Sequence, residues 1–412
     1  MLSFLVDRFK READTIRDWL IHKQNEIGAD PLYASVDIRN AGYKLAPVDT
    51  NLFPGGFNNL CPSFRRAATE LFKMYFHKFY PKAKNILILA EDHTRNLFYF
   101  DNLIVLRDVV RNAGVNCEIA NFSTELVQEM TEFTAASGGK LEMYRPELVG
   151  DQLKIAAFVP DIIIVNNDFS SGVPELIKKI IQPLLPTPFI GWHSRKKSDH
   201  FTHYEQLATD FSKAIDIDPW LISSYFDMME QPDFSDDTSM QTLATKVDVV
   251  LKRVGEKYKQ HNINETPYVF VKNDAGTYGM AVMTASSGDE FLSLNKKQRN
   301  KMKTGKSGRA VTDVIIQEGV RTIDRFKERV AEPVIYLINH QVCGGFFRLH
   351  ETVDDRGNLN QPGVQFTKLC FHELTGYSNE YKGQCDLECL QMILVHIARI
   401  ASLAAGCEIK HV

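Results

Sequence analysis

Three short runs in the first half of the chain constrain its fold most, because helical stretches separate them. The runs span residues 85–92, 161–168 and 187–193, and the first two are rich in isoleucine, leucine and valine. Helical patterns lie between the runs, at 103–113 and 174–185. Alternation of short apolar strands with helices is typical of a parallel sheet. The first half is therefore predicted to form a Rossmann-like parallel α/β domain.

Polar residues follow each predicted strand. They occupy positions 91–96, 166–171 and 193–197, and the earlier segment 37–60 is also dense in asparagine, arginine and aspartate. In parallel sheets, ligands bind where strands end and loops begin. This arrangement predicts one pocket for a small charged molecule.

The second half has a different pattern, because its apolar runs are predicted to pair as hairpins. Such hairpins are typical of an antiparallel sheet with helices. A polar stretch at 228–241 and a helix at 242–260 separate the two halves. We therefore expect domains at 1–235 and 236–412. The predicted strands are 268–272 with 280–285, 313–318, and 334–339 with 345–350, and a final helix spans 386–405.

Composition excludes several classes of protein. The chain has 412 residues with 48 Lys and Arg against 52 Asp and Glu, so no basic field indicates a nucleic-acid or membrane partner. Its seven cysteines are scattered without zinc-site spacing. We expect no apolar stretch of the roughly 20 residues that a membrane helix needs. The charged residues 1–20 predict a surface amphipathic helix rather than a signal peptide. A cytoplasmic protein of undetermined oligomeric state is expected.

The segment "KNDAGTYGMAVM", residues 272–283, places a lysine before a loop of small residues. Backbone amides of such a loop can contact phosphate oxygens, and a lysine adds charge. A P-loop requires its lysine after the glycines and a helix next, whereas here an apolar strand follows. The pattern favours a β-hairpin that covers phosphates, and a plain hairpin with a solvated lysine is the alternative.

Other segments support the phosphate interpretation. The strand 314–320 ends in Gln317, Glu318 and Gly319, where a strand edge would hydrogen-bond adenine. A later hairpin delivers Arg348, which suits a transferring phosphoryl group, and Asn358 and Asn360 follow. This order resembles the ATP-grasp nucleotide-binding domain, as in the glutathione synthetases.

A more specific resemblance covers residues 30–400. The segments "VDIRNAGYKLAPVDTNLFPGGFNNL", "EDHTRNLFYFDNL", "NNDFSSGVPEL", "GWHSRKKSDHF", "VKNDAGTYGM", "LNKKQRNKMK" and "IIQEGV" look like the glutamate–cysteine ligase family of the Acidithiobacillus type. The resemblance implies an ATP-dependent ligase that joins glutamate to cysteine through an acyl phosphate, with ATP and Mg²⁺. The implied catalytic residues are Lys272 and Arg348. The implied ATP-binding residues are Lys272, Gly276, Thr277, Tyr278, Gly279, Gln317, Glu318, Val320, Glu332 and Asn358.

The residues for the amino acids and the metal are less directly implied. Many ATP-grasp ligases hold magnesium with a Glu-x-Asn pair, and no such pair follows Arg348. Metal ligands are therefore expected elsewhere, at Asn360 and Glu351, with Glu318 and Glu332 as further candidates. The expected amino-acid-binding residues are Arg39, Asn40, Lys44, Asp49, Asn51, His93, Arg95 and Arg195.

Three alternatives remain open at this stage. Another ATP-grasp ligase with a different carboxylate and amine would share the hairpin and the strand 314–320. A non-catalytic nucleotide-binding protein would explain the missing Glu-x-Asn pair. The basic run 296–309 forms a solvated helix face, a segment near the phosphates or, least in keeping with the acidic balance, a nucleic-acid patch.

Overall fold

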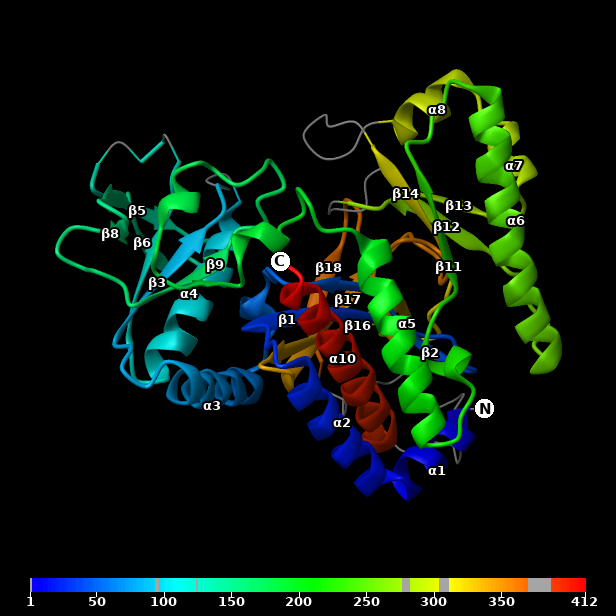
Figure 1. Ribbon diagram of the computed structural model, residues 1–412, viewed down its shortest axis with the longest axis horizontal. Coiled ribbons are helices and arrows are strands. Elements are labelled where there is room, and N and C mark those ends of the chain that lie inside the picture. The colour runs from blue at the N-terminus through cyan, green and yellow to red at the C-terminus, as the bar shows by residue number, and fades with distance from the viewer. Residues whose placement is uncertain are drawn as a thin grey trace.

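The computed structural model describes residues 2–92, 96–123, 125–126, 128–275, 282–303, 311–369 and 387–412. These residues form three larger sheets and one short hairpin, with helices around them (Figure 1). The hairpin pairs β7 (Glu147–Val149) with β8 (Gln152–Lys154).

The central sheet is antiparallel and joins the two ends of the chain. Its strand order is β18-β17-β16-β1-β2, and β15 also pairs with β16. Val36 on β1 lies opposite Ile335 on β16, about three hundred positions later in sequence. The strands are β1 (Tyr33–Asn40), β2 (Leu45–Asn51), β15 (Arg325–Phe326), β16 (Arg329–Ile338), β17 (Gln341–His350) and β18 (Gln365–Lys368). The hairpin predicted at 334–350 is confirmed.

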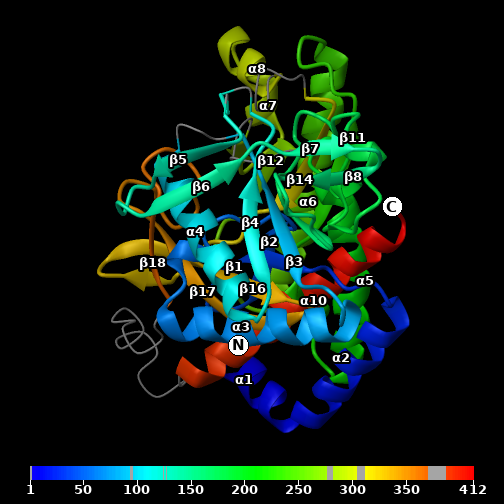
Figure 2. The same cartoon turned by 90° about the vertical axis from the view of Figure 1, so that its left-hand side faces the viewer.

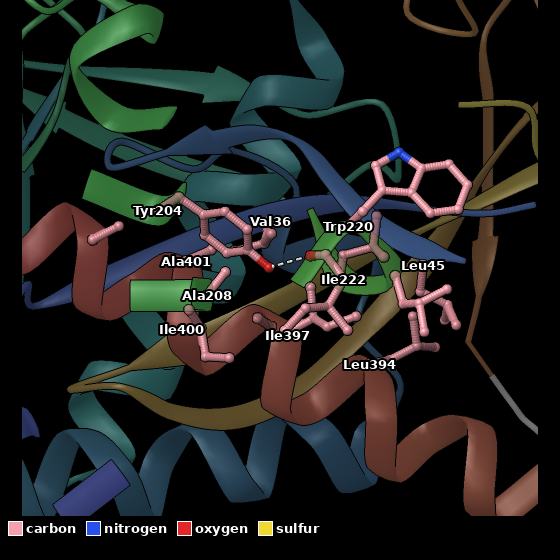
Figure 3. Close-up of a cluster of buried hydrophobic side chains, with 14 of the residues drawn as sticks. Val36, Leu45, Tyr204, Ala208, Trp220, Ile222, Leu394, Ile397, Ile400 and Ala401 are labelled. Carbon is pink, nitrogen blue, oxygen red and sulfur yellow. Dashed lines mark hydrogen bonds between the residues drawn. The ribbon is translucent and has the colours of Figure 1, made fainter. Parts of the chain in front are cut away.

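Helices from both ends of the chain cover one face of this sheet, and the helix at Pro62–Phe79 packs against β16 and β17 as well. In Figure 1, α10 lies against the central strands with α2 and α5 beside it. Figure 3 shows Val36 and Leu45 from the sheet, Leu394 and Ile397 from α10, and Tyr204, whose hydroxyl donates to a carbonyl 2.7 Å away. The covering helices are α1 (Leu2–Arg11), α2 (Ala13–Ile27), α5 (Lys197–Ala214), the 3-10 helix η4 (Pro219–Ile222) and α10 (Leu387–Lys410).

Two expectations about helices need correction. The segment Leu390–Lys410 of α10 is long and apolar enough to cross a membrane by length and composition, and 67% of its apolar window is buried inside the structure. The reason for its apolar character is its place in the core, where Ile393, Ile397 and Ala401 are fully buried. The N-terminal stretch forms two helices rather than one, α1 and α2, and the expected amphipathic character is confirmed in α1, where Leu5 and Phe9 are fully buried.

The second sheet lies within residues 85–185 and is mainly parallel. It is on the left in Figure 1 and faces the reader in Figure 2. Its order is β10-β9-β3-β4-β6-β5, and only β5 runs antiparallel to its neighbour. The bounds are β3 (Asn85–Ala90), β4 (Asn116–Ala120), β5 (Met130–Thr134), β6 (Lys140–Tyr144), β9 (Ile162–Asn166) and β10 (Leu184–Leu185), with helices α3 (Pro62–Phe79) and α4 (Leu97–Asn112).

The parallel pairing predicted for 85–92 and 161–168 is confirmed. Two other predictions in this region are wrong. The expected helix at 174–185 is reduced to the 3-10 helix η2 (Ile177–Lys179) followed by β10, and the expected strand at 187–193 contains the 3-10 helix η3 (Pro188–Ile190). Prolines at 183, 186 and 188 explain both differences, because proline lacks the amide donor that helices and interior strands need.

The third sheet is antiparallel, with the order β11-β14-β12-β13, at the upper right of Figure 1. The hairpin predicted from 268 to 285 is confirmed as β12 paired with β13. Its elements are β11 (Phe226–Glu230), β12 (Val269–Asn273), β13 (Met283–Ala285) and β14 (Asp313–Glu318), with α6 (Asp237–Gln260), α7 (Asp289–Leu292) and α8 (Lys296–Met302).

Strand pairing does not follow the boundary predicted near residue 235. The central sheet combines β1 and β2 from the first half with β15 to β18 from the second half, and the third sheet pairs β11 with β14. The physical reason is that β1 buries its apolar face under α10, so the start of the chain belongs to the same core as its end.

Truncating Ile397 tests this shared core. We expect Ile397→Ala to lower the free energy of unfolding by about 2–5 kcal/mol, because the residue is fully buried beneath the central sheet. Urea denaturation would measure it. The matched control is Ile21→Ala on α2, where the side chain is 51% exposed and the expected change is within about 0.5 kcal/mol. Equal effects of the two substitutions would contradict the packing described.

Candidate active site

A cavity of about 920 Å³ is lined by residues from all three larger sheets. Because side chains alternate along a strand, Ser35, Asp37 and Arg39 of β1 face the cavity, whereas Val36 and Ile38 face the helices. The same face of the central sheet presents Asp49 and Asn51 from β2, Glu332, Val334 and Tyr336 from β16, and Phe346 and Arg348 from β17.

Arg348 links two carboxylates at the centre of this face. Its guanidinium donates to Asp37 at 2.6 Å and to Glu332, which also accepts from Arg39 at 2.9 Å. Burial raises the pKa of Asp37 to about 6, although Arg348 opposes the shift. Burial also raises the pKa of Glu332, but Arg39 and Arg348 outweigh it and leave that pKa below its usual value.

A second group of charges surrounds Asp49, which lies directly opposite Asp37 across the β1–β2 pair. Lys197 donates to Asp49 at 2.6 Å and rests 4.1 Å from the ring centre of Trp192. Lys272 on β12 donates to the carbonyl of Val48 at 3.1 Å. Burial, with the charge of Lys197, lowers the pKa of Lys272 to about 8. Three cations, Arg348, Lys197 and Lys272, therefore converge on two facing aspartates.

At one end of the cavity, the third sheet contributes Phe270, Val282, Gln317 and Glu318. The expectation of a free strand edge here needs correction, because β14 lies between β11 and β12 and its backbone is paired on both sides. The Gln317 amide donates to a serine hydroxyl at 3.1 Å. Glu318 accepts from Lys44 at 2.8 Å and from an indole N–H at 3.1 Å, which holds this corner together.

At the other end, polar residues from the strand ends of the second sheet and from α4 enter the lining. They are Glu91, Asn96, Tyr99, Asn102, Asn166 and Asp168. Those at positions 91, 96, 166 and 168 belong to the predicted strand-end pattern. Asn102 accepts from the backbone amides of Gly56 and Phe57 at 2.8 and 2.9 Å. Gly56 has φ of +104°, a conformation that favours glycine. The loop that follows β2, with its 3-10 helix η1 (Phe57–Asn59), is thereby held against the cavity.

Most predicted site residues that the structure describes line this cavity. They are Arg39, Asp49, Asn51, Lys272, Gln317, Glu318, Glu332, Arg348, Asn358 and Asn360. The other described ones do not line it. They are Asn40, Lys44, Arg195, Val320 and Glu351. Asn40 donates to Asp324, Lys44 binds Glu318 and Arg195 binds Glu408. The carbonyl of Val320 accepts from Arg39, and Glu351 is an exposed partner of Arg329. His93, Arg95, Gly276, Thr277, Tyr278 and Gly279 lie outside the described residues.

Sequence reasoning also missed cavity residues. Asp37, Asn58, Asn59 and Lys197 lie in the polar segments that predict the pocket but were not expected as individual site residues, and Trp192 was not expected at all. One signal was available for the first of these, since Asp37 opens the polar segment 37–60 and alternates with apolar Val36 and Ile38. Lys197 lies in the polar positions 193–197 that predict the pocket, but its contact with Asp49 had no signal, because only the fold brings the start of α5 beside β2.

A metal would find oxygen ligands on β1 and β2. The described residues hold no cluster of three Asp, Glu, His or Cys suited to a metal ion. However, Asp49 and Asn51 flank Thr50 on one face of β2, opposite Asp37. This is an acidic-x-Asn pair beside a second carboxylate. Magnesium is usually bound by one or two carboxylates together with substrate phosphates, so this donor set fits it.

Paired cations and carboxylates in one buried cavity are typical of enzymes that transfer phosphoryl groups, which position charges and neutralise them. The family model of glutamate-cysteine ligase, GshA, matches residues 7–409. The chain therefore belongs to the glutamate–cysteine ligase family, whose members are ATP-dependent ligases.

A solved structure supports this assignment. A crystal structure from Methylobacillus flagellatus KT, named as a candidate gamma-glutamylcysteine synthetase, is 37% identical with a TM-score of 0.89, over 100% of this chain and 96% of that one. A D-alanyl-alanine synthetase A from Vibrio cholerae is 11% identical over 65% and 67% of the two chains, with a TM-score of 0.33 that is too low to support a conclusion. Comparison with curated proteins gives no match.

The pKa of Lys272 yields a prediction about ATP affinity. The lysine is charged below about pH 8 and loses its charge as the pH rises through that value. We expect the Kd for ATP to rise about tenfold from about pH 7 to about pH 9.5, because one hydrogen bond to a charged group contributes about 1.5–3 kcal/mol. Calorimetric titration would measure this. Lys272→Arg keeps its charge and should flatten the profile, and a flat wild-type profile would contradict a phosphate role for Lys272.

Proposed function

We propose that this protein joins glutamate to cysteine, using ATP, to form γ-glutamylcysteine through a γ-glutamyl phosphate. The observation that carries the proposal is the convergence of Arg348, Lys197 and Lys272 on Asp37 and Asp49 in one cavity. This charged centre lies between an end on the third sheet, where Phe270 and Val282 add apolar surface beside Gln317 and Glu318, and a polar end on the second sheet. Such a layout suits a nucleotide at one end and amino acids at the other.

ATP would occupy the end formed by the third sheet, with an ATP-grasp-like mode of binding. Phe270 and Val282 offer apolar contacts for the base, and Gln317 lies beside them. Lys272 extends from β12 toward the charged centre, which places it for the α- and β-phosphates. Asn358 and Asn360 line the same cavity and would contact the phosphates from the loop after β17.

Magnesium would be held by Asp37, Asp49 and Asn51. The acidic-x-Asn pair that the resemblance led us to expect after Arg348 thus has a counterpart at the start of the chain, on β2. The pairing of β1 with β16 brings it beside Arg348. The metal, when bound, neutralises phosphate charge and aligns the transferring group. Of the metal candidates expected from sequence, Glu351 is exposed and outside the cavity lining, which makes it the weaker choice.

The reaction would proceed in two steps. A γ-carboxylate oxygen of glutamate attacks the γ-phosphorus, the bond to the β-phosphate oxygen breaks, and ADP leaves. The amine of cysteine then attacks the acyl carbon, loses a proton, and displaces inorganic phosphate. Arg348 would stabilise the negative charge that spreads over the phosphoryl oxygens, since its planar guanidinium matches that geometry.

The amino acids would bind at the polar end. Asn58 and Asn59 from the loop after β2 line the cavity together with Glu91 and Asp168 from the strand ends. Carboxamides can donate to α-carboxylates, and carboxylates can accept from ammonium groups. The arginines expected to clamp α-carboxylates, Arg39 and Arg195, already bind Glu332 and Glu408, which weighs against that role.

The proposal also covers the family branch of the protein, its location and its partners. We place the protein in the Acidithiobacillus-type branch of its family on the motifs quoted above. We also propose that it acts in the cytoplasm on small molecules, without a nucleic-acid or membrane partner, in keeping with a net charge of −4.

Release of ADP by the purified protein tests the function. With Mg-ATP, glutamate and cysteine present, we expect steady turnover that stops when cysteine is omitted, because the acyl phosphate then has no acceptor. Formation of γ-glutamylcysteine would be followed by mass spectrometry. Turnover with another amine or acid, but not with this pair, would indicate a different ligase. ATP binding without any turnover would indicate a non-catalytic nucleotide-binding protein.

Variants of the charged centre test its role. We expect Lys272→Ala and Arg348→Lys each to lower kcat/KM by about 100-fold or more, because removing one preorganised charge-stabilising donor typically costs that much. Asn40→Ala is the control, since Asn40 binds Asp324 outside the cavity. Circular dichroism would verify folding. Full activity in Lys272→Ala would rule out the proposed arrangement of ATP.

A further inference from the structure

Arg195 and Glu408 form a buried, two-point ion pair beneath the charged centre. Nε of Arg195 donates to Oε1 of Glu408 at 3.1 Å, and Nη2 donates to Oε2 at 2.8 Å. Both side chains are at least nine-tenths buried. His200 lies 3.0 Å from the same carboxylate through Nδ1. Burial raises the pKa of Glu408, but Arg195 and His200 together lower it to about 2, so the pair stays ionised at neutral pH.

The remaining donor of Arg195 reaches β2. Nη1 donates to the backbone carbonyl of Thr50 at 2.6 Å. That carbonyl belongs to the peptide unit between Thr50 and Asn51, and Asp49 precedes it. Fixing this peptide plane constrains the backbone between Asp49 and Asn51, and the Asn51 carboxamide oxygen also accepts from the amide of Phe53 at 3.0 Å.

A second contact from the same segment acts on the same strand. Lys197, two residues after Arg195, donates to Asp49 at 2.6 Å. The indole of Trp192 lies 4.1 Å from the Lys197 ammonium and 4.9 Å from the Arg195 guanidinium carbon. Residues 192–197 thus hold β2 through one backbone and one side-chain contact.

Buried ion pairs contribute little net stability, because desolvation offsets most of their attraction, whereas they do fix geometry. We propose that Arg195 and Glu408 are positioning residues that orient the Asp49–Thr50–Asn51 segment for a divalent cation. The inference rests on the proposed function, which places the metal at this segment. Glu408 lies in the last turns of α10, so the C-terminal helix supports the metal site from beneath the sheet. Arg195, expected from sequence to touch substrate, would act through β2 instead.

Binding of Mn²⁺ tests this inference without any turnover. Mn²⁺ would be titrated into protein saturated with a non-hydrolysable ATP analogue, and free Mn²⁺ would be followed by electron paramagnetic resonance. We expect Glu408→Gln to weaken Mn²⁺ binding about tenfold or more, since loss of an outer-shell partner typically costs 10–100-fold in metal affinity. Affinity for the analogue without metal should change less than twofold.

The control is another buried polar contact on α10. Ser402 is fully buried, and its hydroxyl lies 2.9 Å from Nδ1 of His340, which in turn contacts Asp30 at 3.0 Å. None of these three residues is in the cavity lining, and the hydrogen bond and ion pair described here join them to one another rather than to β2. Ser402→Ala should therefore leave Mn²⁺ affinity unchanged even if it lowers thermal stability.

The outcomes separate the two proposals. Equal Mn²⁺ affinity in wild type and Glu408→Gln would overturn the positioning role and leave the metal site standing. No Mn²⁺ binding by the wild-type protein with the analogue would overturn the metal site and this inference with it. If Glu408→Gln does not fold, Arg195→Lys, which keeps the charge but cannot reach Glu408 and Thr50 together, replaces it with the same expected loss.

Discussion

The contact of Arg348 with Asp37 is the interaction on which the rest of the site depends. It spans 2.6 Å between residues at opposite ends of the chain. It exists because β1 pairs with β16 and β16 pairs with β17 in one antiparallel sheet. Without that pairing, Arg348, which we propose contacts the transferring phosphate, and the candidate metal ligands would lie in separate parts of the molecule.

The central sheet tolerates this concentration of charge because its two faces have different neighbours. One face is apolar and buried under α10. The other carries cations and carboxylates into the cavity, while its Val334, Tyr336 and Phe346 belong to an apolar core shared with α3. Asp37 and Asp49 face each other directly across β1 and β2, a destabilising arrangement for like charges unless cations are near. In the protein without a bound metal, Arg348 and Lys197 are the cations that neutralise Asp37 and Asp49. A bound divalent cation would neutralise part of the same negative charge.

Local patterns predicted much of the fold. The hairpins at 268–285 and 334–350 and the parallel strands at 85–92 and 161–168 follow from apolar runs and their breaks, which the sequence contains directly. The pairing of β1 with β16 could not be predicted in this way, because nothing in either strand specifies a partner three hundred residues away. For the same reason the sequence could not show that Arg195 binds Glu408 rather than substrate, because Glu408 is remote from it in sequence. The sequence contains the acidic-x-Asn pair as Asp49 and Asn51, but the resemblance predicts such a pair only at positions that follow Arg348.

The central claim is that the two ends of the chain combine to hold one metal–phosphate centre. A crystal grown with Mn²⁺ and a non-hydrolysable ATP analogue tests it most directly, through the anomalous signal of the metal. The account predicts an anomalous peak in contact with Asp37, Asp49 or Asn51, with the analogue's phosphates beside Arg348 and Lys272. A peak held instead by Glu351, or by the strand-end carboxylates Glu91 and Asp168, would contradict it.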